Sequence, residues 1–345
     1  MIHQLSLFKS AVWKRVLVIA PHPDDETLAT GGLLQRSIAA GGAVRVVFVT
    51  DGENNPWPQR LLERRWRVGS DARARWGERR RIETLEALDC LGVPASSAVF
   101  LHFPDRGLTS LLLAGGGRAV PALGAELRTW RPTLVAAPAT ADRHPDHSAL
   151  AVLLRLAIDR LAEDERGFAQ LAYVVHGELP AGAVQLSLAP AERLRKRAAV
   201  LRHRSQLVLL RRRFLSHATA TERFVDPGRP TAGHRVLGAA FASGTLSLRL
   251  GPPASLAAAL RARLDVLTED NPGGVVRLRS CRVRPWQHEV ALPIDRVPAR
   301  LLVKCEAPHL FFDTAGWREI PLPEQPAAVS RRSFAARFAG AAADV

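Results

Sequence analysis

Short apolar runs alternate with longer amphipathic stretches through the first two thirds of the chain. Residues 16–20, 44–50 and 133–137 are rich in aliphatic side chains, and each run ends abruptly in polar or charged residues. Runs of this length predict strands that are buried on both faces, as in a parallel sheet. The stretches between them repeat apolar residues at helical spacing, which predicts crossover helices.

Further segments extend this alternation of strands and helices. Additional strands are expected at 98–103 and 171–175, and helical segments at 27–38, 78–91, 108–130, 147–162 and 191–224. The segment 56–77 holds three tryptophans and many arginines without clean periodicity, so we expect a long loop with some helix. The whole pattern predicts an α/β fold with a Rossmann-like, doubly wound, mostly parallel sheet.

The periodicity changes to two in the last third of the chain, which predicts a small antiparallel β domain. Its expected strands are 245–250, 275–283, 288–294 and 299–307, with one helix at 254–267. We therefore divide the chain into three parts. They are an α/β domain at 1–235, a C-terminal β domain of unknown role at 240–325, and a frayed or disordered tail at 330–345.

Two of the predicted strands lead into turns that are dense in ionisable residues. The first turn contains His22, Asp24, Asp25 and Glu26, and the turn after the fourth strand contains Asp142, His144, Asp146 and His147. Strands one and four are neighbours in the usual doubly wound order, and the direction of winding reverses between them. The two turns are therefore expected to face one crevice.

The spacing within the turns suits a metal site. His22 and Asp25 are three positions apart, as are His144 and His147, so each pair can lie on one side of a helical turn. Together the pairs can offer two imidazoles and a carboxylate to one divalent ion, as in a catalytic zinc site, and the same donors can hold Fe²⁺. Asp24 is then placed to act as a general base. Helix capping alone explains one or two of the carboxylates but neither the histidines nor the pairing of two turns.

Composition limits the alternatives. Of 345 residues, 47% are hydrophobic and 23% charged, which is ordinary for a globular protein. The apolar runs are far shorter than the ~20 residues that span a bilayer, and the N-terminal segment does not resemble a signal peptide. We expect no membrane span and a cytoplasmic location.

The widely spaced Cys90, Cys281 and Cys305 exclude a disulfide framework and a thiolate zinc site.

The net charge of +15 arises almost entirely from arginines distributed along the whole chain. A solvated surface explains this distribution better than nucleic-acid binding, because the sequence contains no nucleic-acid motif. An anionic small-molecule substrate would also suit the charge. The sequence gives no information on oligomeric state.

At the two turns the sequence resembles the PIG-L/LmbE-like de-N-acetylases. The matching motifs are PHPDDE at 21–26 and HPDH at 144–147, and the resemblance covers about residues 14–225. It implies a bacterial zinc-dependent hydrolase that cleaves a linear amide C–N bond. The expected reaction removes an N-acetyl or other N-acyl group from a GlcNAc-type amino sugar or glycoconjugate, with a water on the metal attacking the amide carbonyl.

The resemblance also implies roles for single residues in the first turn and its partner. His22, Asp25 and His147 would bind one Zn²⁺ per chain, and Asp24 would be the general base. Some family members carry a tyrosine at the position of Asp142. The role of that tyrosine is therefore not transferred to this chain.

Further roles concern the carbonyl group and the sugar. His144 would polarise the carbonyl or stabilise the oxyanion, with Asp146 orienting it. Arg80 and Asp105 match family positions that contact the sugar. His176, at the end of the fifth predicted strand, is expected to line the pocket by its position alone.

Three other interpretations compete with this one. The same site could serve an amidase that acts on a thiol conjugate or another small acylated amine. A nucleotide-binding Rossmann protein is disfavoured, because Gly31 and Gly32 lie too far into the helix to cradle a pyrophosphate. A non-catalytic carbohydrate-binding protein that uses Trp286 or Trp317 is disfavoured by the intact ionisable turns.

Overall fold

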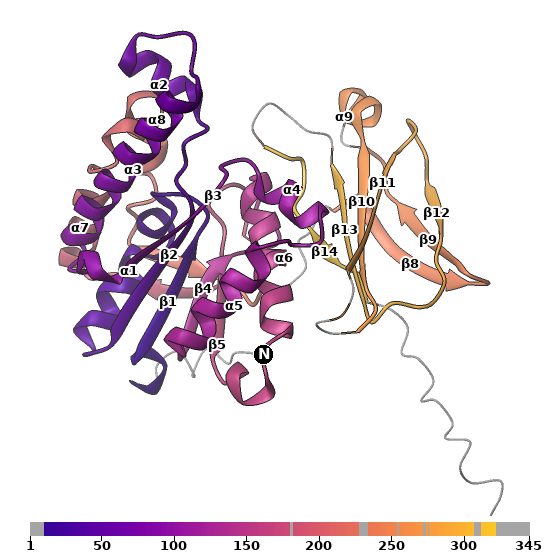
Figure 1. The fold of residues 1–345 in the computed structure, drawn as a ribbon, viewed down its shortest axis with the longest axis horizontal. Coiled ribbons are helices and arrows are strands. Elements are labelled where there is room, and N and C mark those ends of the chain that lie inside the picture. Colours follow the sequence, from indigo (N-terminus) through magenta and orange to yellow (C-terminus); the bar gives the residue numbers. More distant parts are fainter. Residues whose placement is uncertain are drawn as a thin grey trace, which may run out of the picture.

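The computed structural model describes residues 10–179, 182–227, 234–253, 255–271, 274, 276–306 and 312–321 of the 345-residue chain. An α/β unit built on a parallel sheet lies beside a group of antiparallel strands from the C-terminal third (Figure 1). The predicted tail at 330–345 lies outside the described residues.

The central sheet has five parallel strands in the order β3-β2-β1-β4-β5. Its strands are β1 (Arg15–Ala20), β2 (Ala43–Thr50), β3 (Ala98–Phe103), β4 (Leu134–Pro138) and β5 (Ala169–Tyr173). Within β1, Val16 pairs with Leu134 of β4 and with Val44 of β2. The doubly wound α/β fold is thus confirmed, including the predicted contact between strands one and four.

Helices cover both faces of this sheet. In chain order they are α1 (Asp25–Ala39), α2 (Pro56–Glu63), α3 (Ser70–Cys90), α4 (Leu108–Leu113), α5 (Ala119–Trp130), α6 (Pro145–Asp159), α7 (Pro190–Val200) and α8 (Arg204–Leu215). Short 3₁₀ turns lie at η2 (Ser10–Trp13), η3 (Ala95–Ser97) and η4 (Glu163–Arg166). A small antiparallel pair, β6 (Val184–Ser187) and β7 (Thr221–Phe224), flanks α7 and α8 in the chain.

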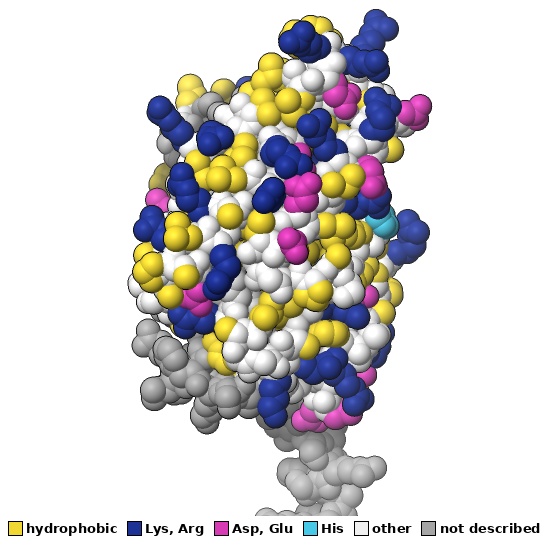
Figure 2. Space-filling view, turned by 90° about the vertical axis from the view of Figure 1, so that its left-hand side faces the viewer, with side chains coloured by type: hydrophobic (Ala, Val, Ile, Leu, Met, Phe, Trp, Pro, Cys, Tyr) yellow, Lys and Arg dark blue, Asp and Glu magenta, His cyan; other side chains and the backbone are white. Residues whose placement is uncertain are grey.

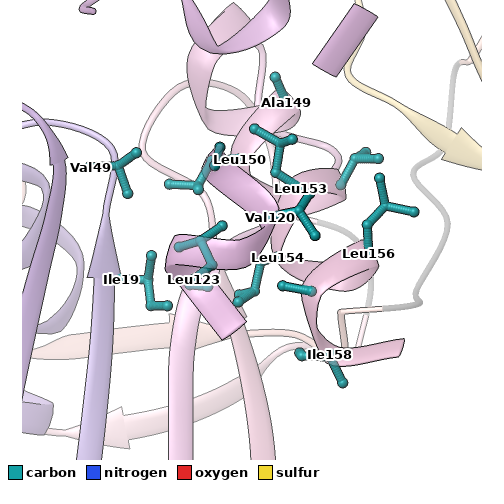
Figure 3. Packing of buried hydrophobic residues seen from close by; sticks show 14 of the residues in the cluster. Ile19, Val49, Val120, Leu123, Ala149, Leu150, Leu153, Leu154, Leu156 and Ile158 are labelled. Atoms are coloured by element: carbon teal, nitrogen blue, oxygen red, sulfur yellow. The ribbon is translucent and has the colours of Figure 1, made fainter. Parts of the chain in front are cut away.

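The alternation of side chains along β1 builds one core on each face of the sheet. Leu17 and Ile19 pack with residues of α4, α5 and α6, among them Leu123 and Leu150 (Figure 3). Val16 and Val18 point to the opposite face and join residues of α1, α3 and α7. Burying each large aliphatic side chain contributes about 1.5–3 kcal/mol, so the two cores hold the carboxyl ends of the strands in fixed positions.

The long loop expected at 56–77 is largely helical. It contains α2, and α3 begins at Ser70 instead of at residue 78. The first turns of α3 are exposed and lack an apolar stripe, so periodicity could not reveal them. Their alanines and arginines are nevertheless good helix formers.

The C-terminal third forms two antiparallel sheets, with strand orders β11-β10-β13-β14 and β12-β9-β8. The elements are β8 (Val236–Ala242), β9 (Thr245–Leu250), α9 (Leu256–Arg261), β10 (Arg263–Glu269), β11 (Val276–Arg282), β12 (Glu289–Pro293), β13 (Arg300–Glu306) and β14 (Arg318–Glu319). The predicted antiparallel β architecture is confirmed. The division of the chain at residues 235 and 240 stays a prediction.

The helix predicted at 254–267 is wrong in its second half. The structure ends α9 at Arg261, and the next residues form β10, which pairs with both β11 and β13. In β10, Leu264 and Val266 enter the β core, a period-two pattern that the preceding alanine-rich helix obscured. Pairing on both sides of β10 outweighs its local helical spacing.

The antiparallel strands pack against α6 of the α/β unit. Leu267, Leu302 and Trp317 join the same core cluster as the buried face of α6. Arg300 is paired with Asp159 at the end of α6, as well as with Glu269. The C-terminal unit therefore contacts the helix that carries the second ionisable turn.

The face formed by α2, α3, α7 and α8 carries Lys and Arg side chains scattered among hydrophobic ones (Figure 2). Among the described residues, no helix combines the length and the apolar character needed to cross a membrane.

Candidate metal and catalytic site

The two ionisable turns meet at the carboxyl edge of the central sheet. The first joins β1 to α1, and the second joins β4 to α6, whose first helical residue is Pro145. The ring centroids of His22 and His147 are 5.2 Å apart, and those of His22 and His144 are 4.8 Å apart. The neighbouring positions of β1 and β4 therefore bring the two predicted groups of residues together.

Three donor atoms have the spacing that a tetrahedral metal site requires. His147 Nε2 lies 3.3 Å from His22 Nδ1 and 3.2 Å from Asp25 Oδ2. The distance from His22 Nδ1 to Asp25 Oδ2 is 3.2 Å. Ligands that bind Zn²⁺ at about 2.0–2.1 Å lie about 3.3 Å from each other along the edge of a tetrahedron. His22, Asp25 and His147 thus fit a single divalent ion.

The electrostatics of this cluster favour a cation. Burial alone lowers the pKa of His22, but the surrounding carboxylates outweigh it and raise that pKa well above its usual value. Burial likewise opposes protonation of His147, while Asp25 and Asp142 raise its pKa to about 10. Carboxylates that attract protons this strongly also stabilise a divalent cation among them.

Overlapping groups of donors extend around the same point. Three further sets within the described residues have donor atoms close enough to hold a metal: His22 with His144 and His147, Asp25 with His147 and His176, and His22 with Asp105 and Asp146. His22 Nε2 lies 3.2 Å from Asp105 Oδ1, yet this buried nitrogen completes no hydrogen bond. Nε2 is not the His22 atom of the triangle above, so the donor cluster extends past those three ligands toward Asp105.

Asp142 holds His147 in position, a role that the sequence did not reveal. Its Oδ2 lies 3.1 Å from His147 Nδ1 and also accepts the backbone N–H groups of Val175 and His176. In the neutral ring this carboxylate keeps the proton on Nδ1, so that Nε2 can face a metal ion. In the sequence, the one indication of this role is that Asp142 stands five positions before His147.

Asp24 lies beside the proposed ligands in a strained backbone conformation. Its φ of 144° falls in a region that side-chain-bearing residues rarely adopt, and the side chain is buried. Burial raises the pKa of Asp24 to about 7, although Arg80 opposes the shift. A carboxylate with a pKa near neutrality can both accept and return a proton.

Arg80 contacts Asp24 and two backbone carbonyls. Its guanidinium donates to Asp24 Oδ2 at 2.8 Å, to the Pro23 carbonyl at 2.7 Å and to the Gly52 carbonyl at 2.8 Å. A Cβ on Gly52, whose φ is 63°, would meet this guanidinium at 1.8 Å. Arg80 thus fixes the orientation of Asp24 while it also borders the cavity.

His144 and His176 also line the cavity, and their surroundings disfavour the protonated ring. Burial lowers the pKa of His144 well below its usual value, and burial lowers the pKa of His176 to about 3. His144 Nδ1 accepts the backbone N–H of Asp146 at 3.3 Å, so the neutral ring carries its proton on Nε2 as a donor. The Asp146 carboxylate itself accepts the N–H groups of Arg106 and Leu108.

The cluster opens into a cavity of ≈ 400 Å³. Seven of the nine residues singled out from the sequence line it, namely His22, Asp24, Asp25, Arg80, Asp105, His144 and His176. The other two, Asp146 and His147, are fully buried beside them. The cavity walls also include residues that sequence reasoning did not select, among them Trp57, Arg213 and Phe312.

Two further histidines of the α/β unit have opposite surroundings. The side chain of His102 in β3 is 52% exposed and lies 2.7 Å from Asp51. His203, just before α8, is 1% exposed and lies 3.2 Å from Thr27 Oγ1 in α1. Local sequence gives no sign of burial for a histidine in a basic helical segment.

This combination of fold and site defines a class: an α/β protein with a candidate metallohydrolase centre at the carboxyl edge of its sheet. Residues 17–158 match the family described as PIG-L: GlcNAc-PI de-N-acetylase. The chain therefore contains a PIG-L family domain, as the two motifs predicted.

Named relatives agree with this assignment. A 1D-myo-inositol 2-acetamido-2-deoxy-alpha-D-glucopyranoside deacetylase of Rhodococcus jostii is 33% identical over 162 residues, or 42% of this chain and 53% of that protein. A deacetylase of the same name from Mycobacterium avium is 34% identical over 146 residues, or 39% of this chain and 47% of that protein. The chain thus spans about half the length of the curated relatives it matches.

Solved structures are also similar. A conserved protein from Thermus thermophilus has 29% identity and a TM-score of 0.46, covering 61% of this chain and 94% of that one. The N,N'-diacetylchitobiose deacetylase from Pyrococcus horikoshii has 22% identity and a TM-score of 0.48, covering 64% of this chain and 87% of that one.

Proposed function

We propose that this protein is a metal-dependent hydrolase that removes an N-acetyl or related N-acyl group from a GlcNAc-type amino sugar or glycoconjugate. The observation that carries the proposal is the triangle of His22 Nδ1, Asp25 Oδ2 and His147 Nε2 beside Asp24, at the base of one cavity. The PIG-L domain and the deacetylase names of its relatives support the choice of substrate class.

The proposed ion is Zn²⁺, one per chain. Two imidazole nitrogens and one carboxylate oxygen with tetrahedral spacing suit Zn²⁺, and Fe²⁺ accepts the same donor types. When bound, the ion supplies Lewis-acid chemistry to the acyl carbonyl and to the attacking water. Side chains of this protein carry out the proton transfers and hold the substrate.

In this proposal Asp24 accepts the proton of the attacking water at its free carboxylate oxygen. Arg80 holds the other oxygen, Oδ2, and limits the rise of the Asp24 pKa. His144 donates from Nε2 to the carbonyl oxygen as negative charge develops there. Losing one such donor typically slows a reaction by about 10²–10³. Asp24 then returns the proton that it took from the water to the departing amine.

The polar side of the cavity is proposed to hold the sugar. Asp105, Arg106 and Asn54 border this side, and their groups match the hydroxyls of a hexosamine. Burial opposes the ionised form of Asp105, but contact with His22 and other groups lowers its pKa below the usual value. Asp105 is therefore available as a charged acceptor for a hydroxyl group.

The test combines metal analysis with amine release. The purified protein should carry about one metal ion per chain and release a free amine from N-acetylglucosaminyl-inositol or another N-acetylhexosamine derivative. Asp24→Asn should retain the metal and lose at least 10²-fold in turnover. Asp89→Asn changes an exposed carboxylate on α3 and should leave both properties unchanged. A metal-loaded wild-type protein that cleaves no N-acyl amino sugar would refute the proposal.

A further inference from the structure

The C-terminal strands reach the turn that carries His144. The Asp313 N–H donates to the Arg143 carbonyl at 2.8 Å, and Arg143 Nε donates to the Asp313 carbonyl at 3.0 Å. The Trp317 N–H donates to the Thr140 carbonyl at 2.8 Å. Residues 312–317 therefore run along the same turn that positions the proposed oxyanion donor.

A buried charge pair anchors this contact. Lys304 in β13 is 1% exposed, and its ammonium binds the carboxylate of Asp313. Lys304 Nζ also lies 3.4 Å from the hydroxyl of Ser148, which directly follows His147 in α6. Close packing continues at Gly316, where an added Cβ would meet the Thr140 carbonyl oxygen at 1.9 Å. The position of segment 312–317 is thus fixed relative to the site.

Phe312 is the residue of this segment that enters the cavity wall. Its ring centroid lies 4.9 Å from that of His176 and 6.0 Å from that of His144. The guanidinium of Arg213 in α8 lies 5.2 Å from the ring centroid and donates to His176 Nδ1 at 2.7 Å. Phe312 therefore packs against side chains of the α/β unit, although it comes from the C-terminal third.

Two walls of the cavity differ in their lining. The wall beside His22 includes Asn54, Arg80 and Asp105 and is polar. The wall beside His144 includes Val175 and Phe312. An N-acyl amino sugar whose carbonyl faces His144 places its sugar and its acyl chain on opposite sides of the carbonyl carbon. Matching polarity puts the hydroxyl-bearing sugar on the first wall and the acyl chain on the second.

We propose that Phe312, supplied by the C-terminal β strands, bounds the acyl side of the site and restricts hydrolysis to short acyl groups. This inference rests on the proposed deacylase function and gives the C-terminal unit a role in substrate selection. Phe312 is a specificity-determining residue in this proposal. It donates no proton and binds no metal.

The experiment measures kcat/KM for a series of N-acetyl, N-propionyl, N-butyryl and N-hexanoyl derivatives of one amino sugar. The wild-type protein should prefer acetyl, and Phe312→Ala should shift the butyryl-to-acetyl ratio by at least tenfold toward butyryl. This is the low end of the ~10–200-fold effect of one methylene in an apolar pocket. Phe312→Leu should shift the ratio in the same direction by less, and it keeps the proposal testable if the alanine variant fails to fold.

The matched control is Trp286→Ala, which removes a 57% exposed aromatic side chain from the same C-terminal unit. This variant should keep the wild-type ratio. If the wild-type protein cleaves the acetyl substrate and folded Phe312 variants keep its acyl preference, the deacylase function stands and the acyl-wall proposal is overturned. A change of sugar preference without a change in acyl preference overturns it equally. If the wild-type protein cleaves none of the series, both proposals fail.

Discussion

His22 Nδ1 and His147 Nε2 lie 3.3 Å apart, although 125 positions separate the two residues in the chain. Each residue belongs to a turn that holds only part of a metal-binding set. The adjacency of β1 and β4 brings the parts together, and the hydrophobic cores on both faces of the sheet fix their distance. The packing that stabilises the fold therefore also sets the distance between the two parts of the candidate metal site.

Asp142→Asn should weaken metal binding by about 10–100-fold, because the substitution removes the carboxylate that orients His147 through Nδ1. Competition with a chelator of known affinity measures the effect. Asp89→Asn, on the exposed side of α3, serves as the control and should bind metal as the wild-type protein does. Unchanged affinity in Asp142→Asn would contradict the orienting role.

Arg80→Gln should move the acidic limb of the kcat/KM–pH profile to higher pH. Burial raises the pKa of Asp24 to about 7 and Arg80 opposes this rise, so removing Arg80 raises the pKa further. The base must be ionised to accept a proton, and a higher pKa leaves less of it ionised at a given pH. Arg79→Gln, one position earlier and half exposed, should leave the limb in place.

His203→Gln should make the fold less sensitive to acid. Burial lowers the pKa of His203 to about 3, against ~6.5 in an unfolded chain. Between these values only the unfolded state binds the proton, so the free energy of unfolding falls as pH drops below about 6.5. At pH 5 His203 alone lowers the free energy of unfolding by about 2 kcal/mol, and the glutamine variant lacks this loss.

Urea unfolding at pH 7.5 and pH 5 measures this difference. The wild-type protein should lose more stability than His203→Gln between the two conditions. His102→Gln replaces an exposed ring and should lose as much as the wild-type protein. An equal loss in all three proteins would show that His203 is not a buried neutral ring.

Lys196→Met should destabilise the α/β unit by about 3–5 kcal/mol. Lys196 Nζ lies 2.6 Å from Glu222 Oε1, and both side chains are buried. Glu222 also accepts the N–H groups of Gly32 and Leu33 within α1, so it cannot move away when its partner is lost. Chemical denaturation measures the change. The exposed Arg197→Met on the same helix should stay within about 0.5 kcal/mol of the wild-type protein.

Most of the α/β framework could be predicted because its signals are local. Aliphatic runs such as 16–20 and 44–50 are short and end in polar residues, so both strands were located to within one residue. The sheet order followed from the alternation of strands and helices, because right-handed crossovers leave few topologies open. The two HxxD and HxxH spacings then identified the part of the sheet edge where the chemistry lies.

Other features have no local signal. The alanine-rich stretch before β10 favours helix, and only pairing with β11 and β13 makes 263–269 a strand. Nothing near His203 in the sequence indicates that it packs against α1. Such outcomes depend on contacts between distant segments, and propensity and periodicity carry no information about those contacts.

The sequence by itself determined the fold class, the two ionisable turns and the donor types of the candidate site, since these follow from periodicity and residue chemistry. Only the tertiary structure decided that Asp142 orients His147, that Arg80 holds Asp24, and that Phe312 from the C-terminal strands borders the cavity. Each of these relationships joins segments far apart in the chain or on different elements. Their distances are set by packing of the whole molecule, which no single stretch of sequence specifies.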